Sequence, residues 1–229
     1  MQARYIILVL LFVAAVLGTA ALRTDRTPVA QEATPPELPA EAVAAIQEGR
    51  YWRASRILGE YLAVSRDSTP EALLVAAQAA AGWGDWAGVE ALLSGRSWLD
   101  SVGGGAGWGL LGASRFARGV WTDSGEALAR YLRLAVREGD RDRGVAAVKR
   151  AIALREAGKH AEAVRAFREA GRLLPQLGDW ITVFTAAAAS ELGDTAAVRE
   201  LLAGLDTELR REWGWRSDVR ARFRAGDTA

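Results

Sequence analysis

Cysteine is absent from this 229-residue sequence, and histidine and methionine each occur once. Disulfide frameworks, thiolate zinc sites and iron–sulfur clusters all need cysteine, and a multi-histidine metal site needs more than the single His160. Carboxylates would be the only side chains able to hold a metal ion. The sequence therefore predicts no metal site and no other cofactor.

An excess of charge of one sign is also missing. Lys plus Arg number 29 and Asp plus Glu number 28, so the net charge at pH 7 is +1. A balanced charge gives no reason to expect nucleic acid as a partner. Hydrophobic residues make up 50% of the chain and charged residues 25%, which is typical of a folded protein and not of a disordered tail.

Catalytic motifs are missing too. No nucleophile motif accompanies His160, so a Ser–His–Asp triad is not predicted, and the Walker phosphate-binding string is absent. The letters of residues 107–112, GWGLLG, match the dinucleotide fingerprint, but no strand is expected before them, and that fingerprint works only between a strand and a helix. We predict no catalytic and no cofactor-binding residues, and that the chain as given is not an enzyme.

The N-terminus carries an export signal. Arg4 precedes an apolar run over residues 5–17, and small residues follow at 18–21. This order is typical of a signal peptide, while residues 6–22 are also just long enough to cross a bilayer. Residues 1–22 are therefore predicted as a signal peptide or a membrane anchor. The protein is expected to be exported, and either periplasmic or anchored to the outer face of the inner membrane.

Residues 23–39 hold four of the six prolines and show no apolar period. Such a segment is predicted to be a Pro-rich linker, extended between the N-terminal segment and the folded part. The folded part is expected over residues 40–229, where Ala, Leu, Val and Arg recur at helical spacing and alternating β-branched runs are almost absent. These features predict an all-α fold.

A glycine that recurs about every 35 residues organises this helical part. The intervals between successive glycines are 35, 35, 39, 35 and 33 residues. A period of this length is typical of stacked helix–turn–helix units, and glycine suits the left-handed cap that ends the first helix of each unit. The glycines are Gly49, Gly84, Gly119, Gly158, Gly193 and Gly226.

Two neighbouring units carry a longer pattern around this glycine. The first has Trp108, Leu111, Gly112 and Gly119, and the second has Ala163, Phe167, Ala170 and Pro175. In this the chain resembles the tetratricopeptide repeat family, although Leu73 and Thr182 stand where other units would have Trp. The resemblance implies a right-handed α-solenoid of antiparallel helix pairs over residues 40–229, with the last repeat apparently incomplete. Ala163 is expected to be buried where the two helices of its unit cross.

Several helix boundaries follow from capping signals. The sequence Thr-Pro-Glu at 69–71 predicts a helix over 70–81, followed by a second helix over 86–93. Glycines at 103–107 predict a loop, and the 39-residue interval predicts a longer or irregular connection near 139–143.

A last helix is expected over 213–224. Trp215, Val219 and Phe223 form an apolar stripe on it, at a spacing of four residues. Part of this stripe is expected to pack on the preceding repeat, and the rest to be covered by a further helix.

Nine tryptophans are a large number for this length. Trp86, Trp108 and Trp121 are expected to pack within repeats. Others are candidates for a groove that stacks on sugar rings or peptide side chains, with packing between repeats as the alternative. These candidate groove aromatics are Trp52, Trp83, Trp98 and Trp180.

Residues 130–172 hold twelve basic and six acidic residues. This surplus would attract an anionic partner, or it belongs to a solvated face of Arg-rich helices.

Two functional hypotheses follow. The first is a non-catalytic extracytoplasmic scaffold, a protein-interaction module of the cell envelope that assembles or supports a peptidoglycan-processing partner. The second rests on a resemblance to the superhelical N-terminal region of soluble lytic transglycosylases. It implies a catalytic domain beyond residue 229, since the Glu-Ser pair of that family is absent here. The expected partners are an envelope protein or peptide, peptidoglycan, and the membrane if the N-terminal segment is uncleaved, but not nucleic acid.

Overall fold

The computed structural model describes residues 38–64, 68–136 and 139–226, and within these ranges the regular structure is helical, without strands. The predicted all-α fold is thus confirmed for this part of the chain. The predicted signal peptide or anchor at 1–22 and nearly all of the linker lie outside the described residues. No helix that the structure describes has the length and apolar character needed to cross a bilayer.

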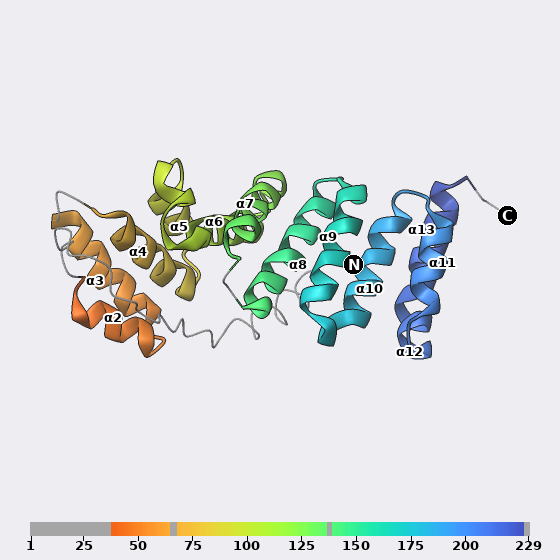
Figure 1. The fold of residues 1–229 in the computed structure, drawn as a ribbon, viewed down its shortest axis with the longest axis horizontal. Helices are drawn as coiled ribbons and strands as arrows, with labels where there is room; N and C mark the ends of the chain where they lie inside the picture. Colours follow the sequence, from red (N-terminus) through yellow and green to blue (C-terminus); the bar gives the residue numbers. More distant parts are fainter. Residues whose placement is uncertain (1–37, 65–67, 137–138, 227–229) are drawn as a thin grey trace.

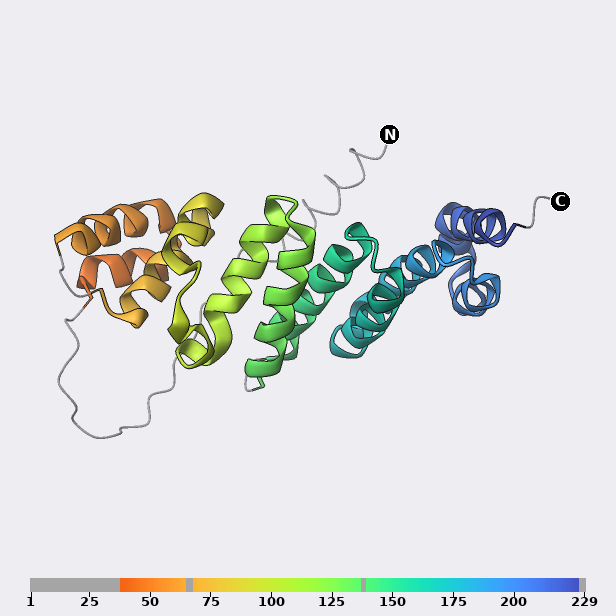
Figure 2. The same ribbon diagram turned by 90° about the horizontal axis from the view of Figure 1, so that it is seen from above.

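The helices pack in pairs that are adjacent in sequence, and the pairs follow one another along the long axis of the molecule (Figures 1 and 2). The pairs are α2 (Ala40–Gln47) with α3 (Tyr51–Val64), α4 (Pro70–Trp83) with α5 (Trp86–Leu93), α6 (Ala106–Ala117) with α7 (Trp121–Leu134), α8 (Asp140–Glu156) with α9 (His160–Leu173), and α10 (Gly178–Ser190) with α11 (Thr195–Ala203). Short elements connect or follow these pairs: η1 (Ser97–Asp100), η2 (Gly103–Gly105), η3 (Pro175–Leu177), α12 (Thr207–Leu209) and η4 (Arg210–Gly214). The last helix, α13 (Trp215–Arg224), packs on α10 and α11.

Each of the six repeat glycines follows the end of a helix within three residues, and the five from Gly49 to Gly193 lie in turns between packed helices, as predicted. The residues after Gly226 lie outside the described ones. The φ angles of the six glycines fall between 70° and 89°, a region that side chains with a Cβ disfavour. At Gly84 the next amide, that of Asp85, donates back to the Ala80 carbonyl at 2.9 Å, which is the hydrogen bond of a Schellman cap. The corresponding hydrogen bond recurs at Gly49, Gly119 and Gly158, so the first helices of these units end at equivalent turns.

Several predicted boundaries agree with the structure and one does not. Thr69 caps α4 by accepting from the Ala72 amide at 3.2 Å; this helix runs two residues beyond its predicted end, and α5 has its predicted bounds. The glycines predicted to form a loop belong partly to η2, and Gly107 lies in α6. The prediction of a longer or irregular connection near 139–143 was wrong, because α8 begins at Asp140. The longer interval is taken up by α8, which has 17 residues.

Small side chains build the interior. Ala163 is fully buried at the crossing of α8 and α9, as predicted, beside the buried Phe167. Buried hydroxyls also join neighbouring helices: Ser114 donates to the Trp86 carbonyl at 2.8 Å, and Ser124 donates to the Gly112 carbonyl at 2.9 Å. Alanine and serine let helix backbones approach closely, so the core is held together by close contacts between neighbouring helices.

The glycines of the GWGLLG string lie inside α6 and not in a strand-to-helix turn. A Cβ on Gly107 would collide with Leu99, and one on Gly112 would lie 2.5 Å from Leu128 Cγ. Trp108 and Leu111 pack in the same part of the core. Helix packing therefore explains this string.

The expectation for the last helix was wrong in one respect. Trp215, Val219 and Phe223 do form a stripe, but none of them packs into the preceding repeat, since their exposures are 55%, 55% and 71%. The buried residues of α13 are Ser217 and Ala221. The turn between α10 and α11 also lies close to the end of α13: a Cβ on Gly193 would lie 3.1 Å from the backbone nitrogen of Ala225.

We predict that Ala163→Leu lowers the free energy of unfolding by about 1–3 kcal/mol, because the added carbons have no space at the α8–α9 crossing. Chemical denaturation of the variant measures the change. Ala161→Leu, at an exposed position of the same helix, is the matched control and is expected to be near neutral. Equal effects of the two substitutions would contradict the packing of this unit.

A second prediction compares two helical glycines. Gly112→Ala is expected to destabilise the protein, since the new Cβ would meet Leu128 and the backbone of α7. Gly59→Ala, where no atom lies within 4 Å of the added Cβ, is expected to stabilise it by about 0.5–1 kcal/mol through helix propensity. Thermal unfolding of both variants tests the opposite signs, and a rise in melting temperature for Gly112→Ala would show that the α6–α7 contact is loose.

Candidate functional site

The four candidate groove aromatics lie on different elements. Trp52 is exposed on α3 beside Arg56, and Trp83 is exposed at the end of α4. Trp98 belongs to η1 and packs against the core that contains Leu99. Trp180, exposed near the start of α10, makes an edge-to-face contact with Trp213, with the ring centroids 5.9 Å apart. No ring contact joins any two of the four within the described residues.

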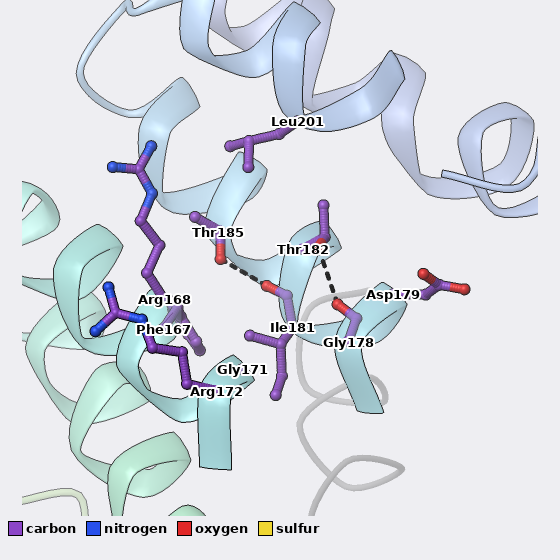
Figure 3. Close-up of a pocket in the computed structure, with 10 residues that line it drawn as sticks. All are labelled: Phe167, Arg168, Gly171, Arg172, Gly178, Asp179, Ile181, Thr182, Thr185 and Leu201. Atoms are coloured by element: carbon purple, nitrogen blue, oxygen red, sulfur yellow. Dashed lines mark hydrogen bonds between the residues drawn. The ribbon is translucent and has the colours of Figure 1, made fainter. Parts of the chain in front are cut away.

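A cleft lies elsewhere, where α9, α10 and α11 meet (Figure 3). Its volume is about 520 Å³, enough for a few side chains of a bound segment. Apolar side chains from all three helices line it, accompanied by two threonines, two glycines and three charged residues. The lining residues are Phe167, Arg168, Gly171, Arg172, Gly178, Asp179, Ile181, Thr182, Thr185 and Leu201.

Local sequence explains why space remains there. Gly171 lies in the last part of α9, and Gly178 begins α10 after the η3 turn, so two positions of the lining have no side chain. Thr182 Oγ1 donates to the Gly178 carbonyl at 2.9 Å, and Thr185 Oγ1 donates to the Ile181 carbonyl at 2.7 Å. Both hydroxyl protons are thus used within α10. The inner wall is consequently apolar, with no hydroxyl donor aimed at a ligand.

The mouth of the cleft is basic on one side. Arg168 and Arg172 are four residues apart on α9 and extend to the same side of that helix, while Asp179 points away from them (Figure 3). Neither guanidinium forms an ion pair with any residue that the structure describes. Glu169, between them in sequence, faces Arg150 on α8 at 3.6 Å. Two arginines therefore remain available for an anionic group.

Two further titratable side chains, Lys149 and His160, do not line this cleft. Burial lowers the pKa of Lys149, on α8, to about 8, while the Nδ1 atom of His160 is buried and has no hydrogen-bond partner among the described residues. No group of three or more His, Asp or Glu side chains suitable for a metal ion occurs in the described ranges. The cleft has a concave surface and two arginines at its mouth, which are features of a binding site for an anionic ligand.

Comparison of the chain with known protein families, curated proteins and solved structures gave no match. The resemblance to tetratricopeptide repeats therefore rests on the motifs of two units and on the recurring glycine.

Sequence reasoning did not identify this cleft. Arg168 and Arg172 belong to the basic stretch at 130–172, and Phe167 belongs to the repeat motif, so both signals were present. Ile181 and Leu201 carried no signal, because an apolar residue that lines a cleft looks like any core residue in the sequence. One signal could have pointed to the cleft. Gly171 lies near the end of a helix and Gly178 follows the next proline, so two positions of the lining lack a side chain.

We predict that Lys149→Met raises the free energy of unfolding by about 1–3 kcal/mol at pH 7, because the buried ammonium group loses hydration. The folded-state pKa of about 8 lies below the ordinary 10.5, so the unfolded chain holds the proton more tightly between these values. The wild-type protein therefore gains stability as pH rises from 8 to 10.5, and the advantage of the variant shrinks over the same range. Denaturant titrations at pH 7 and pH 10.5 measure this.

The matched control is Lys159→Met, at the exposed lysine of the α8–α9 turn. If the stability difference caused by Lys149→Met depends on pH no more than that of the control, burial does not perturb Lys149.

Proposed function

We propose that this protein is a non-catalytic helical-repeat module of the cell envelope, which binds a polypeptide partner and so assembles or supports peptidoglycan-processing proteins. Its fold would be a right-handed solenoid of tetratricopeptide-like units. The single observation that carries the proposal is the cleft between α9, α10 and α11, whose mouth carries two arginines that form no ion pair with any described residue.

The repeat assignment is supported by the equivalent glycine turns. Each unit turns at a glycine with φ near 80°, and each helix pair packs on the next pair. A unit of two short helices cannot bury its own apolar face, so stacking of neighbours is the expected arrangement. Such arrays commonly use their extended surface to hold segments of other proteins.

The envelope location is supported by the N-terminal sequence alone. An apolar run after a single basic residue, followed by a Pro-rich linker, would place the helical part outside the cytoplasm, either free or tethered.

The ligand class follows from the cleft. Phe167 and Ile181 are buried and form the floor of the cleft. The apolar surface left for one side chain of a partner is therefore that of the half-buried Leu201 and the aliphatic stems of Arg168 and Arg172. Arg168 and Arg172 are spaced to bind carboxylates that flank that side chain, since guanidinium groups bind carboxylates with paired hydrogen bonds. An acidic segment with a central apolar residue fits both features.

We predict that a fluorescent peptide with one leucine between aspartates binds the full chain, and that its asparagine counterpart binds at least about tenfold more weakly. Arg168→Glu and Arg172→Glu should each weaken binding of the acidic peptide by a similar factor, because they reverse the charge at the mouth. Fluorescence anisotropy measures these affinities.

Arg165→Glu is the matched control, since this exposed arginine lies on the same helix but does not line the cleft. Binding that is unaffected by Arg168→Glu together with Arg172→Glu, or that falls equally with Arg165→Glu, would show that the cleft is not the binding site.

A further inference from the structure

The helix α13 exposes an apolar stripe that no other described element covers. Trp215, Val219 and Phe223 are 55%, 55% and 71% exposed and recur every four residues. Isolated exposed apolar residues are ordinary, but three in line on one helix form a continuous strip. This strip lies at the end of the molecule opposite to α2 (Figure 1).

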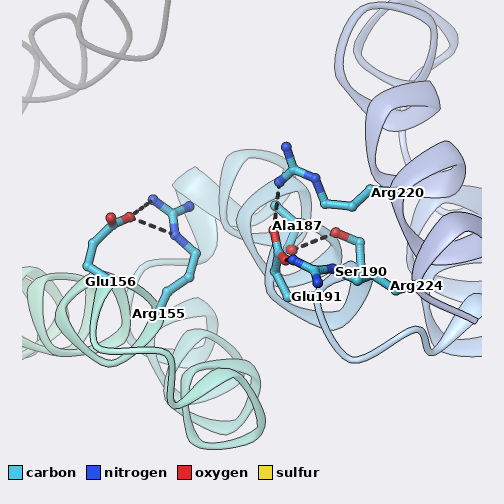
Figure 4. A network of polar contacts seen from close by, with 7 residues as sticks. All are labelled: Arg155, Glu156, Ala187, Ser190, Glu191, Arg220 and Arg224. Carbon is cyan, nitrogen blue, oxygen red and sulfur yellow. Dashed lines mark hydrogen bonds and ion pairs between the residues drawn. The ribbon is translucent and has the colours of Figure 1, made fainter.

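The opposite face of α13 holds the helix in place. Ser217 and Ala221 are buried toward the preceding helices. Arg220 and Arg224 donate to the two carboxylate oxygens of Glu191 at 2.8 and 3.0 Å, which ties α13 to the end of α10 (Figure 4). These contacts hold α13 on the preceding helices through the face opposite to the strip, so the strip faces solvent.

Basic side chains border the strip. At 3.6 residues per turn, Arg216 and Arg222 lie roughly 60° to either side of its centre. The Arg216 guanidinium lies over the Trp215 ring, 5.8 Å from its centroid, and Arg222 faces Asp218 one turn away at 3.0 Å. An exposed i, i+4 pair of this kind is weak in water and leaves Arg222 able to turn toward another anion. In total α13 carries four arginines and one aspartate.

The size and charge of the strip argue against a protein partner or a second copy. Three partly exposed side chains offer on the order of 300 Å², well below the roughly 800 Å² per partner of a standard interface. Two copies meeting through this face would also bring two arginine-rich helices together. A narrow apolar strip with arginines on both sides has instead the form of a helix that lies in a membrane interface.

We propose that α13 binds the surface of an anionic phospholipid bilayer. Trp215, Val219 and Phe223 would enter the boundary between headgroups and acyl chains, while Arg216 and Arg222 reach back to the lipid phosphates. This contact is independent of the α9–α11 cleft. It would hold the far end of the helix array at the membrane whether or not residues 1–22 stay attached.

The absence of cysteine permits a local test in the full chain. Val219→Cys is labelled with a polarity-sensitive dye and mixed with vesicles of phosphatidylcholine alone or with about one-third phosphatidylglycerol. Val64→Cys, at the 84% exposed end of α3, carries the same dye as the matched control. Because the dye reports only its own surroundings, insertion of the N-terminal segment into vesicles does not produce the signal.

The expected result is a blue shift and a several-fold rise in emission at position 219 with the anionic vesicles. The signal should fall at high salt, and position 64 should not respond. Adding Phe223→Ser to the labelled protein should raise the lipid concentration at half-response about tenfold, and Phe223→Leu should not. The double substitution Arg216→Gln and Arg222→Gln should also raise the concentration of anionic lipid at half-response.

The proposal is overturned if the dye at position 219 does not respond to vesicles. It is equally overturned if that dye responds alike to neutral and anionic vesicles, or if the dye at position 64 responds as strongly. It is also overturned if the dye at 219 responds to protein concentration without lipid, which would identify the strip as a self-association surface.

Discussion

The left-handed turn at the end of each first helix is the constraint on which the rest of the structure depends. A helix pair of this size buries too little apolar surface to be stable alone, so every unit must turn back at the same place and present its face to the next. Glycine supplies this turn at Gly49, Gly84, Gly119 and onward, with φ between 70° and 89°. Because successive units turn at a glycine in the same backbone region, the pairs can follow one another in order along the chain (Figure 1).

Close approach of the helices is the second consequence of this arrangement. Alanine at the crossings, serine hydroxyls that donate to carbonyls of the neighbouring helix, and glycine at Gly112 all shorten the distance between backbones. Bulky residues are then excluded from the crossings and occupy the spaces between units, as Phe167 does when it stacks on Phe184, with the ring centroids 5.9 Å apart. Stability therefore depends on small residues at defined positions as much as on large apolar ones.

The same packing decides where binding surfaces remain. Between α9 and α11 the glycines at 171 and 178 leave the lining without side chains at two points, and an open cleft with an arginine-bearing mouth results. At α13 the small residues Ser217 and Ala221 are buried against the preceding helices, while Trp215 and Phe223 are exposed. The cleft thus results from missing side chains, and the exposed strip on α13 results from burial of the small-residue face of that helix.

The sequence by itself determined the helical class, the five glycine turns from Gly49 to Gly193, the start of α4 at Pro70, the bounds of α5 and the burial of Ala163. Each of these depends on local chemistry: a proline and a capping threonine define a helix start, a periodic glycine defines a turn, and a repeated motif defines a crossing. Only the tertiary structure decided that the long interval extends α8, that Ile181 and Leu201 line a cleft, and which face of α13 is buried. The stripe of Trp215, Val219 and Phe223 would pack well against a wide groove, but in the structure the buried face of α13 is the one that carries Ser217 and Ala221. Hydrophobic periodicity identifies the apolar face of a helix, whereas the distance to the neighbouring backbone decides which face can be buried.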